Sequence, residues 1–285
     1  SFSTPRGKLT AVNGISFHLN PGETLALVGE SGCGKTVSAL SILRLLPEPP
    51  AEILSGKIIF DGQDLLSLRA KVLQDLRGHS ISMIFQDPMT SLNPVLTVGE
   101  QIAETLLRHT TMNRQEALQK SADLLRRVEL PSPKEKHYPH QLSGGMRQRV
   151  MIAMALACSP RVLIADEPTT ALDVLIQAQI LELLRSLKKE TSILIIPHDL
   201  GVVAEIAQRV LVMYAGEIVE SGPAKAVLNN PFHPYTKGLI ASIPKLGTKK
   251  KPGARLEEIS GNVPSLDQRP PGCSFHPRCA WAMEK

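Results

Sequence analysis

The sequence predicts an α/β protein built around a mainly parallel β-sheet. Three short, continuous apolar runs, Thr24–Val28, Val162–Ala165 and Ser192–Ile196, suit strands that are buried on both faces. Segments with helical spacing separate these runs, and strands that alternate with helices are typical of a parallel sheet. The length of 285 residues fits one large domain, or one domain with a smaller appendage.

The expected elements follow this alternation along the chain. Short strands are expected over residues 1–28, with a loosely alternating stretch at Ala11–Leu19 before the first apolar run. A helix is expected from Thr36 until the prolines at 47, 49 and 50. The remaining expectations are strands at Gly56–Asp61 and Ser82–Phe85 with a polar helix between them, largely helical structure from about 90 to 160, and a helix over Ile176–Lys189.

The character of the chain changes after residue 222, where prolines become frequent and the periodicity fades. We therefore expect a main domain over residues 1–222, with a helical subdomain at about 90–160, and a C-terminal extension over 223–285. The extension is either a separate small module or an extended strap over the main domain.

Composition excludes several classes of protein. Only 4% of the residues are aromatic, which disfavours a nucleic-acid platform based on base stacking. The formal net charge of +5, from 32 basic and 27 acidic side chains, is small. The four cysteines suit a reducing compartment better than a secreted disulfide framework. No apolar run approaches the roughly 18 residues that span a bilayer, so we expect a soluble chain.

A phosphate-binding loop follows the first apolar run. Residues 29–36 match the pattern G-x-x-x-x-G-K-[ST], between an expected strand and an expected helix. In such a loop the backbone N–H groups and the helix N-terminus bind phosphate, Lys35 reaches the β- and γ-phosphates, and Thr36 ligates Mg²⁺. The alternative, a glycine-rich turn, is disfavoured by this context. The predicted nucleotide-binding residues are Gly29, Glu30, Ser31, Gly32, Cys33, Gly34, Lys35 and Thr36.

Two acids end the second apolar run. Asp166 and Glu167 stand where the carboxyl end of a parallel strand meets its ligands. Asp166 is expected to hold Mg²⁺ through water, and Glu167 to polarise the water that attacks the γ-phosphate. Taken alone, the pair could also be two solvated acids at a strand end. Behind a phosphate loop, the sequence predicts hydrolysis of a nucleoside triphosphate, with a P-loop NTPase (RecA-like) core.

A second candidate anion site precedes a long apolar helix. The residues concerned are Leu142, Ser143, Gly144, Gly145 and Gln148, within the stretch LSGGMRQR. Ser-Gly-Gly at a helix start leaves free N–H groups, although Ser143 could equally be a simple N-cap. Two phosphate-binding helix ends in one chain suggest that one of them serves the nucleotide of a neighbouring chain.

With these three motifs the sequence resembles the ATPase subunits of ATP-binding-cassette (ABC) transporters. LSGGMRQR is similar to their signature, and GESGCGKT and VLIADEP are similar to their two Walker motifs. Gln86 in IFQDP, Asp173 in ALD and His198 in IPHDL match their Q-loop, D-loop and switch histidine, in the order of the family. The resemblance implies the remaining parts of the fold, namely an N-terminal antiparallel β subdomain and a helical signature subdomain.

The resemblance also implies how the site works. Two ATP molecules would lie in a head-to-tail dimer, each between the Walker residues of one chain and the signature of the other. Gln86 would join Thr36 and Asp166 around Mg²⁺, and His198 would bind the γ-phosphate beside Glu167. Asp173 would bridge the two sites, and Phe2 would stack on adenine. Two departures are Pro197, where Thr or Ser usually precedes the histidine, and Leu175, where Thr is common.

The tail narrows the resemblance to the di- and oligopeptide importer branch. FQDPMTSLNP at 85–94, PFHPYT at 231–236 and the closing GNVPSL and PPGCSFHPRC are similar to that branch, which nickel and glutathione importers partly share. In that branch tail cysteines can hold a [4Fe–4S] cluster, which usually requires four thiolates. Cys273 and Cys279 are expected to be half of a truncated metal site; two free thiols or a disulfide are the alternatives. Cys33 and Cys158 are expected to be packing residues.

The function predicted from these motifs is ATP hydrolysis to ADP and phosphate, coupled to import of di- or oligopeptides. The alternatives are an ABC importer ATPase for nickel or glutathione, and a non-transport ABC ATPase that acts on nucleic acid. The expected cofactors are ATP and Mg²⁺. The expected partners are a second, identical or different, ABC ATPase subunit, two transmembrane permease subunits and, indirectly, an extracytoplasmic peptide-binding protein, with no nucleic acid. The chain is expected at the cytoplasmic face of the inner membrane.

Overall fold

The computed structural model describes all residues except 6, 171, 188–189, 243–258 and 284–285. The chain divides into two compact units. The first comprises residues 1–18, 25–57 and 199–285, and the second comprises residues 19–24 and 58–198. The domain boundary expected near residue 222 lies inside the first unit, because the C-terminal residues pack with the segment that contains the phosphate loop.

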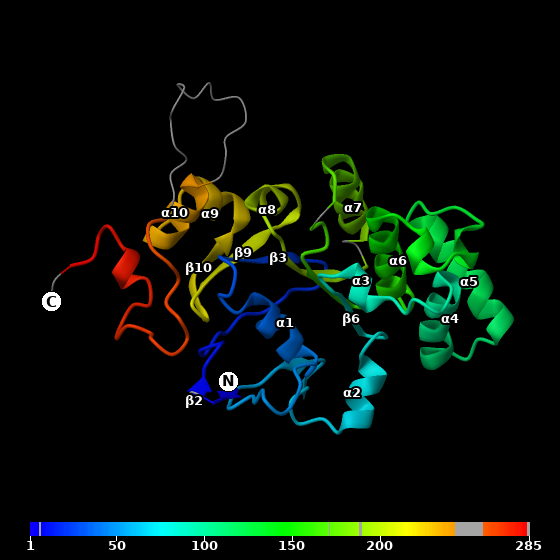
Figure 1. The fold of residues 1–285 in the computed structure, drawn as a ribbon, viewed down its shortest axis with the longest axis horizontal. Coiled ribbons are helices and arrows are strands. Elements are labelled where there is room, and N and C mark those ends of the chain that lie inside the picture. The colour runs from blue at the N-terminus through cyan, green and yellow to red at the C-terminus, as the bar shows by residue number, and fades with distance from the viewer. Residues whose placement is uncertain (6, 171, 188–189, 243–258, 284–285) are drawn as a thin grey trace. The chain divides into compact units, whose positions relative to one another are not determined.

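The first unit contains a short hairpin, part of the main sheet and several helices (Figure 1). Its strands are β1 (Phe2–Thr4), β2 (Gly7–Leu9), β3 (Thr24–Val28), β9 (Arg209–Tyr214) and β10 (Glu217–Pro223). Its helices are α1 (Lys35–Ile42), α8 (Leu200–Ile206), α9 (Ala224–Asn229), α10 (Pro234–Ala241) and the 3₁₀ turn η4 (His276–Arg278). β1 pairs antiparallel with β2, β3 runs parallel to β9, and β10 returns antiparallel along β9.

The second unit combines three parallel strands with the helical region. Its strands are β4 (Ile59–Phe60), β5 (Gln63–Asp64), β6 (Ile81–Ile84), β7 (Val162–Asp166) and β8 (Ser192–Ile196). Its helical elements are α2 (Ala70–Leu76), α3 (Pro88–Ser91), α4 (Val98–His109), α5 (Arg114–Arg127), η1 (Lys134–Lys136), η2 (Pro139–Gln141), α6 (Gly144–Leu156) and α7 (Val174–Ser186). β4 and β5 are antiparallel, whereas β6, β7 and β8 are parallel.

The apolar runs form the strands that the sequence predicts. Every residue of β3 and of β8 is buried, as is β7 from Leu163 to Asp166. Continuous apolar runs fit these strands because both faces are covered, so that no alternation of polar residues is needed. The prediction of an α/β fold with a mainly parallel sheet and an N-terminal antiparallel strand pair is confirmed.

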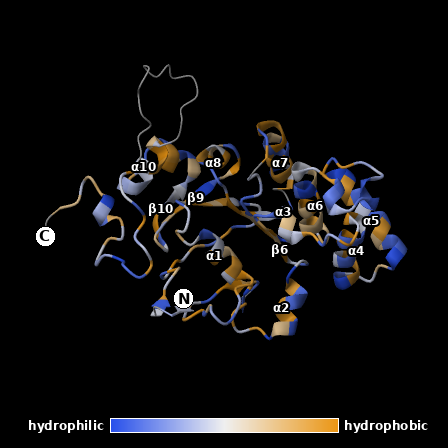
Figure 2. Ribbon diagram, viewed as in Figure 1, coloured by the Kyte–Doolittle hydropathy of each residue, from blue (hydrophilic) through white to orange (hydrophobic). Residues whose placement is uncertain are grey.

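The helical region from 90 to 160 is also found as predicted. Helices α4 and α5 each begin with a capping box, Thr97 with Glu100 and Asn113 with Glu116, which satisfies N–H groups at both helix starts. Figure 1 shows α4, α5 and α6 beside one another, and all three pairs are in contact. In Figure 2 helix α7 is mostly hydrophobic, and its first residues, Val174 and Leu175, are exposed.

Three local expectations differ from the structure. The stretch Ala11–Leu19 forms no strand; its backbone turns toward the loop between β9 and β10, where the N–H of Asn13 donates to the carbonyl of Gly216 at 2.8 Å. The first long helix ends at Ile42, before the prolines, because Arg44 adopts a positive φ of 49°. The expected helix over Ile176–Lys189 begins two residues earlier, and its residues 188–189 lie outside the described part.

None of the helices that the structure describes is long and apolar enough to cross a bilayer.

Candidate active site

The phosphate loop joins β3 to α1 in the first unit, and two of its glycines are sterically required. Gly29 has a φ of 154°, and a Cβ there would stand 2.1 Å from the carbonyl oxygen of Met213. Gly34 has a φ of 107°, and its Cβ would meet the carbonyl oxygen of Ala11 at 2.8 Å. L-residues rarely adopt these φ values, and both contacts are with rigid backbone. The loop therefore keeps this shape only with glycine at both positions.

Lys35 lies inside the loop that it closes. Its Nζ donates to the carbonyl oxygens of Gly29 at 2.8 Å and Glu30 at 2.9 Å, and the residue is only 9% exposed. Cys33, within the loop, is fully buried, and this burial raises the pKa of its thiol although Lys35 opposes the shift. A buried thiol with a raised pKa is a packing group. Thr36, one residue into α1, is exposed.

Three predicted catalytic residues follow the carboxyl ends of adjacent parallel strands in the second unit. Gln86 follows β6, Glu167 follows β7 and His198 follows β8. The register aligns Ile84 with Ala165 and Asp166 with Ile196, so the three strand ends lie at one edge. This is the edge at which ligands of parallel sheets bind.

The Glu167 carboxylate is held by two side chains. The Nε2 of Gln86 and the hydroxyl of Thr170 both donate to its Oε2, each at 2.8 Å. Glu167 itself has a φ of 47°, and its N–H donates to the carbonyl of Ile196 at 2.8 Å. The carboxylate is therefore oriented by neighbours on one oxygen, and its backbone is fixed to β8. Thr170 was not predicted; a hydroxyl three residues after the acid was the available signal.

Two other predicted site residues, Asp166 and His198, differ strongly in exposure. Asp166 ends β7 and is 1% exposed, whereas His198 is exposed. Pro197 departs from the usual Thr or Ser before the histidine, and β8 ends one residue before it, at Ile196. Pro197 therefore lies outside the strand, so its missing N–H removes no hydrogen bond from the sheet, and β8 stays paired with β7 up to Ile196.

The signature stretch begins helix α6. Ser143 is the N-cap, and its hydroxyl accepts a hydrogen bond from the N–H of Met146 at 3.4 Å. Ser143 and Gly144 are exposed, whereas Leu142 and Gln148 are each 3% exposed. A Cβ on Gly145 would stand 2.9 Å from the Ile176 side chain on α7. Ser143 and Gly144 are therefore accessible at the N-terminus of α6, whereas Leu142, Gly145 and Gln148 pack against the rest of the unit.

Asp173 lies at the start of helix α7, and Phe2 lies at the start of strand β1. Asp173 is the exposed N-cap of α7, and its carboxylate accepts the N–H of Ile176 at 2.9 Å. Phe2 is half-buried in β1, opposite Leu9.

The two tail cysteines are free thiols, Cys273 exposed and Cys279 half-buried. Within the described residues no group of three or more His, Cys, Asp or Glu side chains could hold a metal ion. The structure therefore gives no support to an iron–sulfur cluster.

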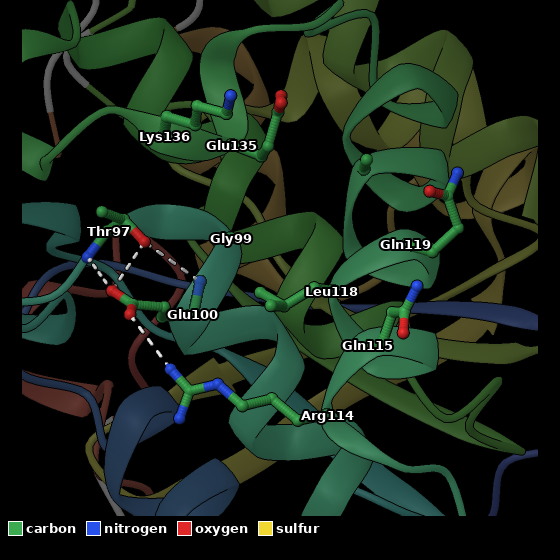
Figure 3. Close-up of a pocket in the computed structure, with 10 residues that line it drawn as sticks. Thr97, Gly99, Glu100, Arg114, Gln115, Leu118, Gln119, Glu135 and Lys136 are labelled. Carbon is green, nitrogen blue, oxygen red and sulfur yellow. Dashed lines mark hydrogen bonds and ion pairs between the residues drawn. The ribbon is translucent and has the colours of Figure 1, made fainter.

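A separate cavity of about 650 Å³ lies in the helical region. Figure 3 shows Arg114 directed toward Glu100, whose carboxylate it reaches at 3.5 Å, and Thr97 beside the same carboxylate. These polar contacts belong to the start of α4, and no predicted site residue lines the cavity.

Comparison with known proteins agrees with this arrangement. Residues 12–170 match the family described as ABC transporter, and residues 219–285 match the family described as the C-terminal region of oligopeptide/dipeptide transporters. The second match begins close to the predicted extension.

Two curated relatives come from Bacillus subtilis (strain 168). The chain is 54% identical to the dipeptide transport ATP-binding protein DppD over 98% of this chain and 84% of the relative. It is 51% identical to the oligopeptide transport ATP-binding protein OppD over 100% of this chain and 80% of the relative.

A solved dimeric structure of MJ0796, described as a bacterial ABC transporter cassette, superposes with a TM-score of 0.71. It is 28% identical and covers 78% of this chain and 94% of its own. A second, post-hydrolysis MJ0796 dimer with ADP and Pi bound gives a TM-score of 0.68 at 29% identity, over 75% of this chain and 90% of that one.

The strand–loop–helix phosphate loop and the acid-bearing strand edge define an ATPase of the P-loop class. With the family matches, the chain belongs to the ATP-binding subunits of the ABC transporter family.

Proposed function

We propose that this chain hydrolyses ATP to drive import of di- or oligopeptides, as a peripheral subunit at the cytoplasmic face of the inner membrane. The observation that carries the chemistry is the Glu167 carboxylate, oriented by Gln86 and Thr170 at the end of β7. The cargo is supported by the match of residues 219–285 and by relatives named for dipeptide and oligopeptide transport.

Mg²⁺ is the metal that the donors fit. Thr36 offers a hydroxyl, Asp166 a carboxylate and Gln86 an amide oxygen, and oxygen donors are those that Mg²⁺ prefers. The hydrogen bond from Gln86 to Glu167 uses Nε2, which leaves Oε1 of the same amide as an acceptor. An ion held by these three residues would neutralise negative charge on the triphosphate.

The chain's own residues perform the remaining steps of hydrolysis. Glu167 accepts a proton from the water that attacks the γ-phosphate. The hydrogen bonds from Gln86 and Thr170 to Oε2 orient its carboxylate for this step. Lys35 leaves the carbonyls of Gly29 and Glu30 to contact the β- and γ-phosphates. His198 donates a hydrogen bond to the γ-phosphate, and Phe2 stacks on the adenine.

A second ATPase subunit completes each site. Ser143 and Gly144 at the exposed N-terminus of α6 would bind the γ-phosphate held by the phosphate loop of a partner chain, head to tail. Asp173 would bridge the two sites, and the exposed apolar residues Val174 and Leu175 beside it would be covered there. The dimers of the structural relative support this arrangement. Two permease subunits and, outside the membrane, a peptide-binding protein would complete the importer.

Glu167→Gln tests the chemistry. This variant should bind ATP as the unchanged chain does and lose nearly all turnover, because the amide cannot take a proton from water. Glu182→Gln is the matched control, since Glu182 is an exposed acid on α7 whose carboxylate pairs with its helix neighbour Arg185 at 3.0 Å. Near-normal phosphate release by Glu167→Gln, in the presence of Mg²⁺, would remove Glu167 from the proposed role.

Uptake into proteoliposomes tests the cargo. The chain, its membrane subunits and binding protein should accumulate a radiolabelled dipeptide only with internal ATP. Accumulation of nickel ion or glutathione in place of the peptide would contradict the proposed cargo while leaving the ATPase assignment intact.

A further inference from the structure

Two residues of the C-terminal extension, Tyr235 and Arg278, form hydrogen bonds with Glu30, the second residue of the phosphate loop. The guanidinium of Arg278 forms a bidentate ion pair with Glu30, with Nη1 to Oε2 at 2.7 Å and Nη2 to Oε1 at 3.0 Å. The Arg278 side chain is only 5% exposed, and that of Glu30 is 27% exposed. A fork-to-fork contact of this kind fixes direction as well as charge.

Every donor of this guanidinium is used. Beyond Glu30, Nε donates to the carbonyl of Ser260 at 3.0 Å, Nη2 to the carbonyl of Ile259 at 3.1 Å, and Nη1 to the Tyr214 hydroxyl at 3.4 Å. A guanidinium has five N–H groups, and these contacts occupy all of them. Arg278 is therefore built into its place, and it fixes the Glu30 carboxylate there.

The backbone of Glu30 is held by a second C-terminal residue. Its N–H donates to the hydroxyl oxygen of Tyr235 at 2.8 Å, and Tyr235 is fully buried in α10. Burial raises the pKa of the Tyr235 phenol, so the group stays neutral. Tyr235, Tyr214 and Phe275 pack against one another with ring centroids 4.6 to 5.5 Å apart. This aromatic cluster anchors the C-terminal segment to β9.

The charge on Glu30 gives these contacts a consequence for nucleotide binding. A carboxylate in a loop that binds a triphosphate opposes that ligand, unless a cation neutralises it or holds it away. Arg278 does both, because the ion pair is bidentate and largely buried. Loss of Arg278 would leave one uncompensated negative charge in the phosphate loop.

We propose that Arg278 and Tyr235 are positioning residues for ATP, through which the C-terminal segment sets the affinity of the phosphate loop for nucleoside triphosphate. This inference rests on the proposed binding of ATP by the phosphate loop. The sequence gives no sign of such a role for residues 235 and 278, because they lie far from the loop along the chain. Neither residue is a ligand of ATP in this scheme; both act through Glu30.

The test is a double-mutant cycle on the full chain, with ATP and Mg²⁺ binding measured by calorimetry and turnover measured in parallel. Arg278→Ala should raise the Kd and KM for ATP about tenfold at low salt, with kcat much less affected. The loss should shrink as the salt concentration rises, because its cause is repulsion between the triphosphate and the unpaired Glu30 carboxylate, which salt screens. The double variant Glu30→Ala/Arg278→Ala should bind ATP as well as Glu30→Ala alone, since the unpaired carboxylate is gone.

Arg269→Ala is the matched control. Arg269 is also a C-terminal arginine, but it donates to the carbonyl of Thr10 at 2.7 Å and not to the loop. Its variant should keep the Kd for ATP. A double variant as weak as Arg278→Ala would overturn the proposal and make Arg278 either a direct ligand or a purely structural group.

Tyr235→Phe keeps the test decisive if Arg278→Ala does not fold. The change removes only the acceptor of the Glu30 N–H, and it should raise the KM for ATP about threefold with kcat unchanged. An unchanged KM would overturn the proposal. Failure of the proposed function is a different result, since the unchanged chain would then lack ATP binding or turnover altogether.

Discussion

Gly29→Ala is the sharpest test of the phosphate loop. An alanine at the φ of Gly29, 154°, costs about 1–3 kcal/mol in backbone strain. Its Cβ would also stand 2.1 Å from the Met213 carbonyl oxygen, a contact that neither β3 nor β9 can relieve by rotating a side chain. In the variant the free loop must therefore adopt another conformation, and part of the free energy of ATP binding is used to restore the original one. We expect the affinity for ATP to fall about a hundredfold, which corresponds to about 3 kcal/mol.

Gly32→Ala is the matched control within the same loop. Gly32 has a φ of 79°, but a Cβ there meets nothing within 4 Å, so only strain of about 1 kcal/mol remains. Calorimetric titration with ATP and Mg²⁺ should show a loss of about fivefold, and urea unfolding should show how much of each effect is stability. If Gly29→Ala bound ATP within threefold of Gly32→Ala, the steric reasoning would be refuted.

Two further predictions concern stability. Arg149→Ala should lower the free energy of unfolding by about 2 kcal/mol in urea, because the buried guanidinium donates to the Val128 carbonyl at 2.7 Å and to Gln179 at 2.6 Å; an equal loss from the exposed Arg185→Ala would contradict this. Burial alone would raise the pKa of Glu220, but hydrogen bonds from the N–H groups of Phe232 and His233 lower it below its ordinary value of 4.5. Its contribution to stability is therefore fully present above pH 4.5 and is lost as the pH falls through the lower folded pKa. The Tm of Glu220→Gln should lie below that of the unchanged chain at pH 6 and converge with it in acid; a constant gap would contradict the argument.

Much of the fold was predictable because it is encoded locally. The buried strands β3, β7 and β8 are continuous apolar runs, and the phosphate loop is eight consecutive residues between a strand and a helix. The stretch at Ala11–Leu19 misled the prediction because its weak alternation has no strand partner. Its backbone instead bonds to the loop at Gly216, a contact that no local pattern announces.

The candidate site divides in the same way. Glu167 could be predicted from its place after an apolar run behind a phosphate loop, whereas Gln86 and His198 were predicted from the resemblance to the ABC family. Only the parallel register of β6, β7 and β8 places the three strand ends at one edge. That Gln86 donates to the same carboxylate oxygen as Thr170 followed from the structure alone.

The sequence by itself determined the chemistry of this protein: a phosphate loop, an acidic strand end and a signature, all short motifs whose residues act within a few positions of one another. The tertiary structure decided what holds that chemistry in place. Glu30 meets Tyr235 and Arg278 across separations of 205 and 248 residues, over which a chain carries no periodic signal. Such contacts depend on where the packed elements bring their side chains, and this is fixed only when the whole core is buried.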